Sequence, residues 1–316
     1  MSNSGSATPP ESESRADGDA GARRCAAVLG VALCAEVVNA TLSQDAAKVD
    51  LLFSFRDGFD STRLITLHCQ VKYGRSYRAE SSTKQVLTLN IDRKTIEVLA
   101  DYPSLLAWVP PKPSSAIYWH IFMPRTPIKT PIKIRRSQRV SPAIRYDLTR
   151  AFAHARWAIQ PSKQDVAPEQ EAGVIMARAR KSYRLLQGAE WHHPLVGRLR
   201  ISRIGWRHKT RRSKPTVQRL KALRIVPYLK SVLDKMPDRF VRSESTSTEI
   251  GDRLVEVRYL TCWYRDALRM EHVDYVLIIC IREEVSYPKN WHKYPLSTDE
   301  IQQSAVLMSW WANPMK

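Results

Sequence analysis

The chain has 316 residues, with 50 Lys and Arg against 31 Asp and Glu, which gives a formal net charge of +19 at pH 7. Hydrophobic residues make up 43% of the chain and aromatic residues 9%, so most of it can bury a core and extensive disorder is excluded. The longest apolar run, residues 25–38, contains an acid and is far shorter than the roughly 20 residues that a bilayer crossing needs. We therefore expect no membrane partner. The five cysteines form no Cys-x-x-Cys pair, which predicts reduced thiols in a cytoplasmic protein without a zinc site.

The N-terminal half is predicted to be an α/β domain spanning residues 22–160. Residues 1–21 are rich in Ser, Pro, Gly and charged residues, so we expect a disordered tail. Periodicity and turn residues then predict a helix at 22–39, a hairpin of strands at 49–55 and 63–73, a strand at 85–91, a helix at 93–101, strands at 105–109 and 117–122, and a helix at 142–159. Residues 161–172 are polar and contain proline, which predicts a linker.

Residues 173–316 are predicted to form a second, basic α+β domain. We expect strands at 254–264 and 275–282 and a short helix near 298–311. Between residues 178 and 224 the sequence holds 15 Lys and Arg against a single acid, Glu190, which places +14 of the net charge in 47 residues. Such a density of positive charge indicates binding to the phosphate backbone of nucleic acid.

The predicted hairpin brings three chemically useful side chains together. Its turn centres near residue 60, so Asp50 is expected opposite Gln70 to Lys72. Gln70 and Lys72 are two residues apart on one strand and therefore share a face of the sheet. A carboxylate and an amide oxygen can hold Mg²⁺, and an ammonium beside them can orient water or stabilise developing charge. Hydrolysis of a phosphodiester bond requires these groups.

These residues resemble the PD-(D/E)XK nuclease superfamily, in particular its Mrr-like branch and related bacterial proteins in which Gln replaces the second acid. The resemblance covers residues 22 to 122, including Asp50, the triplet Gln70-Val71-Lys72, and the strand, helix and strand pair that follow. It implies a restriction-endonuclease-like mixed sheet flanked by helices. It also implies that Asp50, Gln70 and the carbonyl between Gln70 and Lys72 hold Mg²⁺, while Lys72 positions the nucleophile. An acid on the preceding helix often completes such a site, and Glu36 is the candidate.

Simpler interpretations stay open for each of these residues. Asp50 also fits the start of an ordinary strand, and Lys72 fits a solvent-facing lysine on an edge strand. Glu36 fits equally well the exposed stripe of a helix. The other acids near these strands fit turns or caps, with Asp92 a lesser candidate for the metal site.

The residues expected to contact nucleic acid lie in the basic segment. They are Arg198, Arg200, Arg203, Trp206, Arg207, His208, Lys209, Arg211, Arg212 and Lys214. Trp206 fits either a platform for an exposed base or a core position. Another interpretation, a faint resemblance to RelE and barnase-like ribonuclease toxins, joins part of this segment to groups after the last predicted strand: Arg207, His208, Thr210, Arg211, Arg282, Ser286 and Tyr287.

The function expected from the sequence is Mg²⁺-dependent endonucleolytic cleavage of DNA, in bacterial defence or within a mobile element. The expected partner is nucleic acid, with DNA favoured, together with a second copy of the chain or a partner protein of a defence system. Two alternatives stay open: a non-catalytic nucleic-acid-binding or assembly protein whose nuclease fold has decayed, and a ribonuclease in the C-terminal domain.

Overall fold

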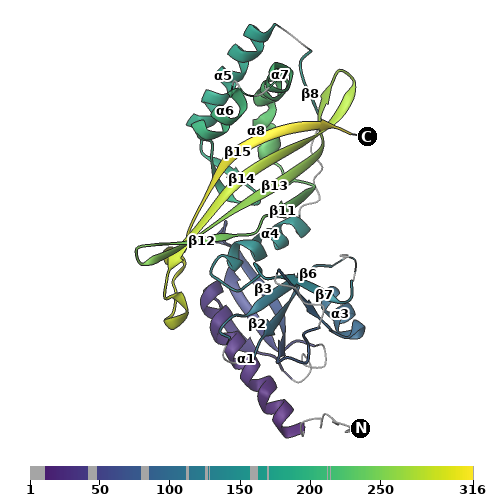
Figure 1. Ribbon diagram of the computed structural model, residues 1–316, viewed down its shortest axis with the longest axis vertical. Coiled ribbons are helices and arrows are strands. Elements are labelled where there is room, and N and C mark those ends of the chain that lie inside the picture. Colours follow the sequence, from purple (N-terminus) through teal and green to yellow (C-terminus); the bar gives the residue numbers. More distant parts are fainter. Residues whose placement is uncertain are drawn as a thin grey trace, which may run out of the picture. The chain divides into compact units, whose positions relative to one another are not determined.

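The computed structural model has a mixed α/β fold (Figure 1). It describes residues 11–41, 48–79, 85–111, 114–124, 127, 129–156, 163–168, 171–211, 213 and 215–315. These residues form two compact units. Unit 1 contains the described residues of Met1–Asp57, Ser61–Leu148 and Asn290–Thr298, and unit 2 contains those of Gly58–Asp60, Thr149–Lys289 and Asp299–Lys316. The division falls inside helix α4 (Ile144–Arg156), earlier than the linker expected at 161–172.

Unit 1 is built on a five-stranded mixed sheet with the strand order β1-β2-β3-β5-β6. These strands are β1 (Glu36–Asn39), β2 (Leu51–Arg56), β3 (Leu64–Tyr73), β5 (Ser104–Val109) and β6 (Tyr118–Phe122). The β3 and β5 strands are parallel, and all other neighbours in this sheet are antiparallel. The predicted hairpin at 49–55 and 63–73 and the predicted strands at 105–109 and 117–122 are therefore confirmed.

The two faces of this sheet are covered by different elements. Helix α1 (Glu11–Leu33) packs on one face, where the thiols of Cys25 and Cys69 are hydrogen-bonded. The other face carries α3 (Arg93–Ala100) and a two-stranded sheet of β4 (Val86–Leu89) and β7 (Ile132–Arg135), which share one hydrophobic cluster with β5. Within α1 the buried residues recur about every four positions, at Gly21, Cys25, Leu29 and Leu33, so that one stripe of the helix faces the sheet.

The structure corrects the start of the predicted domain. The expected disordered tail is helical from Glu11 onward, and residues 1–10 lie outside the described part. The helix predicted to reach residue 39 ends at Leu33, because Cys34 adopts the left-handed conformation with φ 50° and Ala35 N–H donates to the carbonyl of Gly30. The residues that follow form strand β1, which pairs with β2.

Unit 2 is built on an eight-stranded sheet whose main path has the order β11-β13-β14-β15-β10-β9. Its strands are β8 (Gln164–Asp165), β9 (Trp191–His193), β10 (Gly197–Arg200), β11 (Arg239–Arg242), β12 (Thr246–Ile250), β13 (Arg253–Met270), β14 (Val273–Pro288) and β15 (Gln302–Pro314). The helices are α5 (Ala172–Gly188), α6 (Arg203–Thr210), α7 (Thr216–Ile225) and α8 (Leu229–Leu233), with short 3₁₀ turns η1 (Val226–Tyr228), η2 (Trp291–Lys293) and η3 (Thr298–Glu300). The strands predicted at 254–264 and 275–282 are confirmed, whereas the helix predicted near 298–311 is wrong. That region forms β15, which pairs with both β14 and β10.

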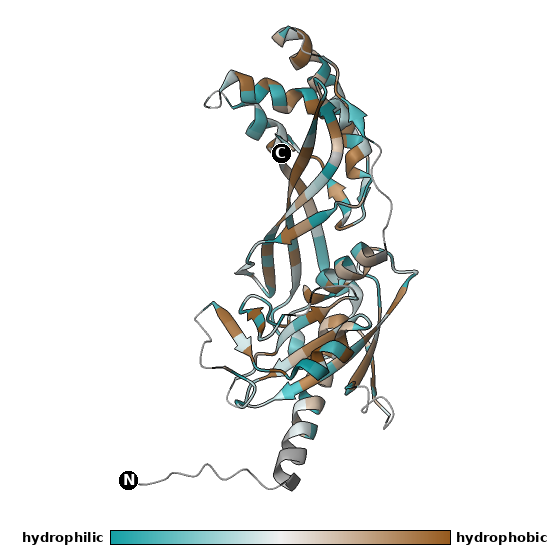
Figure 2. Ribbon diagram, turned by 90° about the vertical axis from the view of Figure 1, so that its right-hand side faces the viewer, coloured by the Kyte–Doolittle hydropathy of each residue, from teal (hydrophilic) through white to brown (hydrophobic). Residues whose placement is uncertain are grey.

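The core of unit 2 lies between the sheet and its helices. Buried residues alternate along β13 and β14, for example Leu260, Cys262 and Tyr264, and they pack against apolar residues of α5 and α7. The helices of this unit carry both hydrophobic and hydrophilic residues (Figure 2), as expected for helices with one buried face. Of the described helices, none is both long enough and apolar enough to cross a bilayer.

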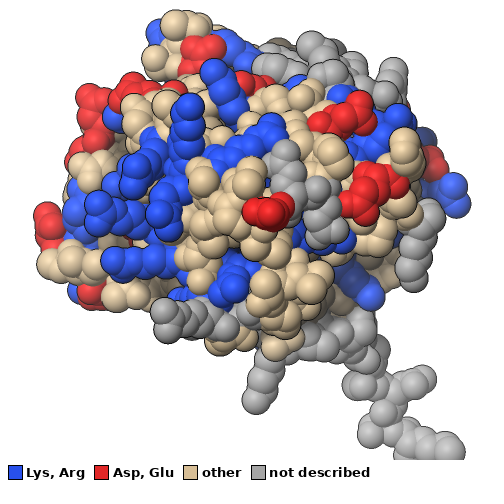
Figure 3. All heavy atoms as spheres, turned by 90° about the horizontal axis from the view of Figure 1, so that it is seen from above, with Lys and Arg blue, Asp and Glu red and all other residues tan. Residues whose placement is uncertain are grey.

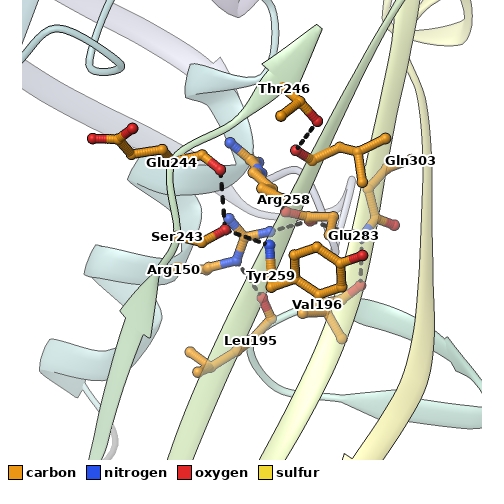
Figure 4. Close-up of polar contacts among 11 residues, drawn as sticks. Arg150, Leu195, Val196, Ser243, Glu244, Thr246, Arg258, Tyr259, Glu283 and Gln303 are labelled. Carbon is orange, nitrogen blue, oxygen red and sulfur yellow. Dashed lines mark hydrogen bonds and ion pairs between the residues drawn. The ribbon is translucent and has the colours of Figure 1, made fainter. Parts of the chain in front are cut away.

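A fully buried charge cluster lies inside unit 2 (Figure 4). Arg150 of α4 and Arg258 of β13 both form ion pairs with Glu283 of β14, the second at 2.6 Å. The Arg150 guanidinium also donates to the Leu195 carbonyl at 2.8 Å, and Gln303 donates to Glu283 at 2.9 Å. Two buried cations therefore share one carboxylate, and hydrogen bonds from neighbouring groups complete its shell.

Candidate active site

The register of the hairpin places Asp50 directly opposite Gln70, as the sequence predicted. Leu51 pairs with Cys69, and the Asp50 N–H donates to the Cys69 carbonyl at 2.9 Å. One carboxylate oxygen of Asp50, Oδ2, accepts from the Gln70 amide at 2.5 Å and from the Val71 backbone N–H at 2.6 Å. The hairpin therefore brings Asp50 and Gln70 into direct contact.

Lys72 lies on the same face of β3 as Gln70, because the two residues are two positions apart. This face looks toward α3: Gln70 pairs with Leu106 and Lys72 with Trp108, both members of the cluster that contains the α3 residues. The Lys72 ammonium lies 5.4 Å from the centre of the Tyr77 ring, a cation–π contact. The three predicted groups thus share a face of the sheet, with the lysine tip held toward Tyr77.

Glu36, the fourth predicted residue, is not part of this group. It pairs with Ser54 at the far end of β2, whereas Asp50 lies beyond the other end of that strand. At about 3.3 Å per strand residue, the separation is more than 10 Å along the sheet. Glu36 was expected on a helix, either facing the site or on the exposed stripe, but α1 ends at Leu33 and Glu36 lies on the exposed edge strand β1.

Two further residues lie near the site: His68, which was not assigned to it from the sequence, and Asp92, which was a lesser candidate for the metal site. His68 precedes Gln70 by two positions on the same face; its ring contacts Tyr102 at 4.6 Å, and burial lowers its pKa. Asp92 caps α3 by accepting from the N–H and hydroxyl of Thr95. These bonds lower the Asp92 pKa, and the positive charge of Lys72 lowers it further. The strand period of two could have identified His68 from the sequence, because it shares a face with Gln70. No spacing rule links Asp92 to Lys72.

Two buried polar atoms on this face have no hydrogen-bond partner. They are His68 Nδ1 and Gln70 Oε1, which are half of the four such side-chain atoms among the residues that the structure describes. An unpaired buried acceptor costs roughly 1–3 kcal/mol, so native proteins rarely leave one without a reason such as an ion or water. The Gln70 amide oxygen, next to the Asp50 carboxylate, has the chemistry of a hard-cation ligand.

The donor set is small for a metal site. Within the described residues no group of three or more His, Cys, Asp and Glu side chains is placed to hold a metal. One carboxylate and one amide oxygen nevertheless fit Mg²⁺, which keeps several of its waters and commonly binds proteins through one or two carboxylates.

The basic segment is only partly available for binding. Arg200, Arg203, Arg207 and Arg211 are exposed, but Arg198 is ion-paired with Glu190, and Arg212 and Lys214 lie outside the described residues. Lys209 is buried, with its ammonium 5.6 Å from the ring centres of both Trp310 and Trp311. It is therefore not available for the predicted contact with phosphate. His208 is half-buried.

Trp206 fits the core interpretation rather than a free stacking platform. Its ring is half-buried and lies 5.2 Å from that of Tyr183, at the margin of the unit 2 core.

The groups of the ribonuclease interpretation are not gathered in one place. Arg282 and Tyr287 lie on opposite faces of β14, because their positions differ by an odd number. Tyr287 is buried and donates to Glu256, Arg282 is paired with Glu284, and the Ser286 hydroxyl accepts from Arg253 at 2.7 Å.

Comparisons of the chain with protein-family models, with curated proteins and with solved structures gave no match.

Proposed function

We propose that the protein is a metal-dependent endonuclease that cleaves DNA, with its active site on the β2-β3 hairpin of unit 1. The observation that carries this proposal is the unpaired, buried Gln70 Oε1 beside the Asp50 carboxylate. A divalent cation bound there would give Gln70 Oε1 the partner that it lacks within the hairpin, with the Asp50 carboxylate as a second oxygen ligand.

The order of elements in unit 1 supports a restriction-endonuclease-like arrangement. Helix α1 is followed by three antiparallel strands of the main sheet, then by β4 of the two-stranded sheet, helix α3, and β5, which is parallel to β3. The candidate residues occupy the start of the second strand and the end of the third, as the resemblance to PD-(D/E)XK nucleases implies.

The chain's own groups have distinct expected roles. Asp50 and Gln70 would hold Mg²⁺, which when bound supplies charge stabilisation to a phosphodiester under attack. Lys72 would orient the attacking water or stabilise the negative charge that develops on the phosphate. Asp92 lies close enough to Lys72 for the two opposite charges to attract each other.

A second candidate function, non-catalytic binding of nucleic acid, is favoured by a different observation. Asp50 Oδ2 already accepts two hydrogen bonds within the hairpin, and Asp50 is the only acid of the predicted set at the site. If those bonds persist in the presence of Mg²⁺, the domain keeps its shape without binding the ion.

Incubation of supercoiled plasmid with the protein in Mg²⁺ or EDTA distinguishes the two functions. The endonuclease is expected to nick the plasmid only with Mg²⁺, and Lys72→Ala is expected to slow nicking by about 10²- to 10³-fold, the usual cost of removing one charge-stabilising group. Lys94→Ala, which removes an exposed lysine from α3 of the same unit, serves as the matched control and should cut normally.

Equal activity of Lys72→Ala and the parent protein would exclude this site as the catalytic centre. Binding that is steeply salt-dependent, with no cutting in Mg²⁺, would support the non-catalytic function. Cutting of RNA that survives EDTA and the Lys72→Ala change would instead favour a separate ribonuclease.

A further inference from the structure

Helices α5 and α6 of unit 2 form a basic cleft. Its lining residues are Arg180, Tyr183, Arg184, Gln187, Arg203, Trp206 and Arg207, around a volume of about 350 Å³. Four of the seven are arginines and none is acidic. Figure 3, which looks toward these helices, shows Lys and Arg side chains gathered on this part of the surface.

The two arginine pairs are presented in the same way by the two helices. Arg180 and Arg184 are four residues apart on α5, and Arg203 and Arg207 are four apart on α6. Residues at this spacing lie on one face of a helix, so each helix offers a row of two cations. All four are exposed, and none has an ion-pair partner among the described residues.

The floor of the cleft fixes these rows in place. The Tyr183 hydroxyl donates to the Ser202 carbonyl at 2.7 Å, and Ser202 is the residue that caps α6. Gly205 allows the close approach of the helices, because a Cβ there would lie 2.8 Å from the Tyr183 hydroxyl oxygen. The ring of Tyr183 stacks on Trp310 of β15 at 5.7 Å. The cleft is therefore preorganised by the sheet beneath it.

We infer that this cleft binds the phosphate backbone of duplex DNA. Four exposed guanidinium groups without acidic partners favour a polyanion, whereas a small anion would need a buried, charged donor that this cleft lacks. The aromatic residues at its floor are occupied in packing, so no free ring is offered to an unstacked base. Contacts to phosphates confer no sequence preference, and a duplex presents a higher density of phosphates along its axis than a single strand does.

This inference deepens the proposed function, because the duplex held here would be the substrate of the candidate active site. It keeps Arg203 and Arg207 of the predicted segment 198–214 and adds the arginines of α5, which were not among the predicted contacts. Arg198, which was among them, is already paired with Glu190.

The cleft is tested by fluorescence anisotropy with a short labelled DNA duplex in EDTA, over a range of salt concentrations. Arg184→Gln/Arg207→Gln should weaken binding of every sequence alike and reduce the slope of log affinity against log salt by about 2, close to one unit for each lost phosphate contact. Arg184→Lys/Arg207→Lys retains the charges and should retain the slope.

The matched control is Arg269→Gln/Lys289→Gln, which removes the same net charge from two exposed, ion-paired residues of unit 2. An equal loss of slope in this control would show a general charge effect and overturn the inference. Tighter binding of single-stranded DNA or of RNA than of duplex DNA would also overturn it.

The two proposals can fail separately. If the protein nicks plasmid in Mg²⁺ but its DNA binding does not depend on Arg184 and Arg207, the proposed cleft is contradicted and the endonuclease is supported. If DNA binding depends on these arginines but the protein does not cut, the proposed endonuclease is contradicted and the cleft is supported.

Discussion

Residue 70 decides how the candidate site behaves without a metal. Because glutamine has both a donor and an acceptor, its amide nitrogen donates to Asp50 while Oε1 is left unpaired. Rotation of the amide would turn that oxygen toward the carboxylate, an arrangement that is favourable only with a cation between them. If the proposed site binds a cation, the Gln70 amide has to turn its oxygen toward that cation.

Gln70→Glu is expected to distinguish the site without a metal from the site with one. Without metal, a second carboxylate against Asp50 should lower the free energy of unfolding by roughly 1–3 kcal/mol, because a hydrogen bond is replaced by like-charge repulsion. With Mg²⁺ the second acid should tighten ion binding. Thermal unfolding with and without Mg²⁺ measures both effects.

The exposed change Gln85→Glu adds the same charge to unit 1 and is the control. If Gln70→Glu were as stable as the parent in EDTA and gained nothing from Mg²⁺, the two oxygens would not form a cation site.

His193 in unit 2 is expected to make stability depend on pH. Its Nδ1 accepts from the Leu195 N–H at 3.1 Å, so Nε2 carries the proton toward the Tyr264 hydroxyl at 2.8 Å. Burial, with a smaller effect of the Arg150 charge, lowers its pKa from 6.5 to about 3. The unfolded chain therefore takes up this proton first, and the contribution of His193 to stability is lost progressively as the pH falls from 6.5 toward 3.

Denaturant unfolding at several pH values tests this dependence. His193→Gln should be less stable than the parent at pH 7, but should lose less stability between pH 6.5 and 4.5. His292→Gln, at an exposed position in η2, should retain the parent slope. Identical slopes for all three proteins would contradict a neutral buried imidazole.

At the scale of elements, the turn between β13 and β14 departs from the usual choice of residues. Both turn residues, Glu271 and His272, have positive φ, 51° and 67°. Two-residue turns of this kind favour Asn-Gly, because most side chains are strained in that conformation. Glu271 is ion-paired with Arg224 at 3.0 Å, and this contact accounts for a glutamate at that position. No such contact is seen at His272 among the described residues.

His272→Gly should therefore stabilise unit 2 by about 0.5–1 kcal/mol, since the relief of strain exceeds the added flexibility of the unfolded chain. Denaturant titration measures the gain. Val273→Gly, one position later and inside β14, is the contrasting change and should destabilise the protein. A destabilised His272→Gly variant would show that the imidazole makes a contact worth more than the strain.

Elements with strong local signals could be predicted from the sequence, and elements settled by tertiary packing could not. The β2-β3 hairpin followed from its turn residues, and α3 from Asp92 as its cap. The end of α1 was missed because Cys34, not glycine, takes the left-handed position. The run at 302–314 resembled a helix because Ala, Leu and Met are good helix formers, yet pairing with strands on both sides makes it β15.

The same difference between local signals and tertiary packing determines which residues of the candidate site could be predicted. Asp50, Gln70 and Lys72 came from a local register that the period of two determines. His68 follows from that same period, but Asp92 is brought near Lys72 only by the packing of α3 on the sheet. The arginines of α5 became part of a cleft only through their contact with α6.

For the whole molecule, each unit has its own source of stability. The buried Arg150–Glu283–Arg258 cluster belongs to unit 2 alone. Glu283→Gln should lower the stability of unit 2 by about 3–5 kcal/mol, because it leaves two buried cations without a carboxylate. Unfolding followed by circular dichroism should show this loss.

Glu249→Gln breaks only the exposed pair with Lys289 and should cost less than about 1 kcal/mol. The Mg²⁺-dependent stabilisation expected for the site in unit 1 should survive in Glu283→Gln. If the two substitutions had equal effects, the buried cluster would not hold the unit together.

The return of residues 290–298 to unit 1 affects how the protein can be made and divided. Trp291 of η2 is buried, and η2 contacts α1, so a segment from near the C-terminus is part of the N-terminal unit. During translation, unit 1 stays incomplete until residues 290–298 have left the ribosome, although N-terminal domains generally fold first. Any fragment that ends before residue 290 would lack this tryptophan. Poor solubility of such a fragment would therefore be no evidence against the chemistry of the hairpin.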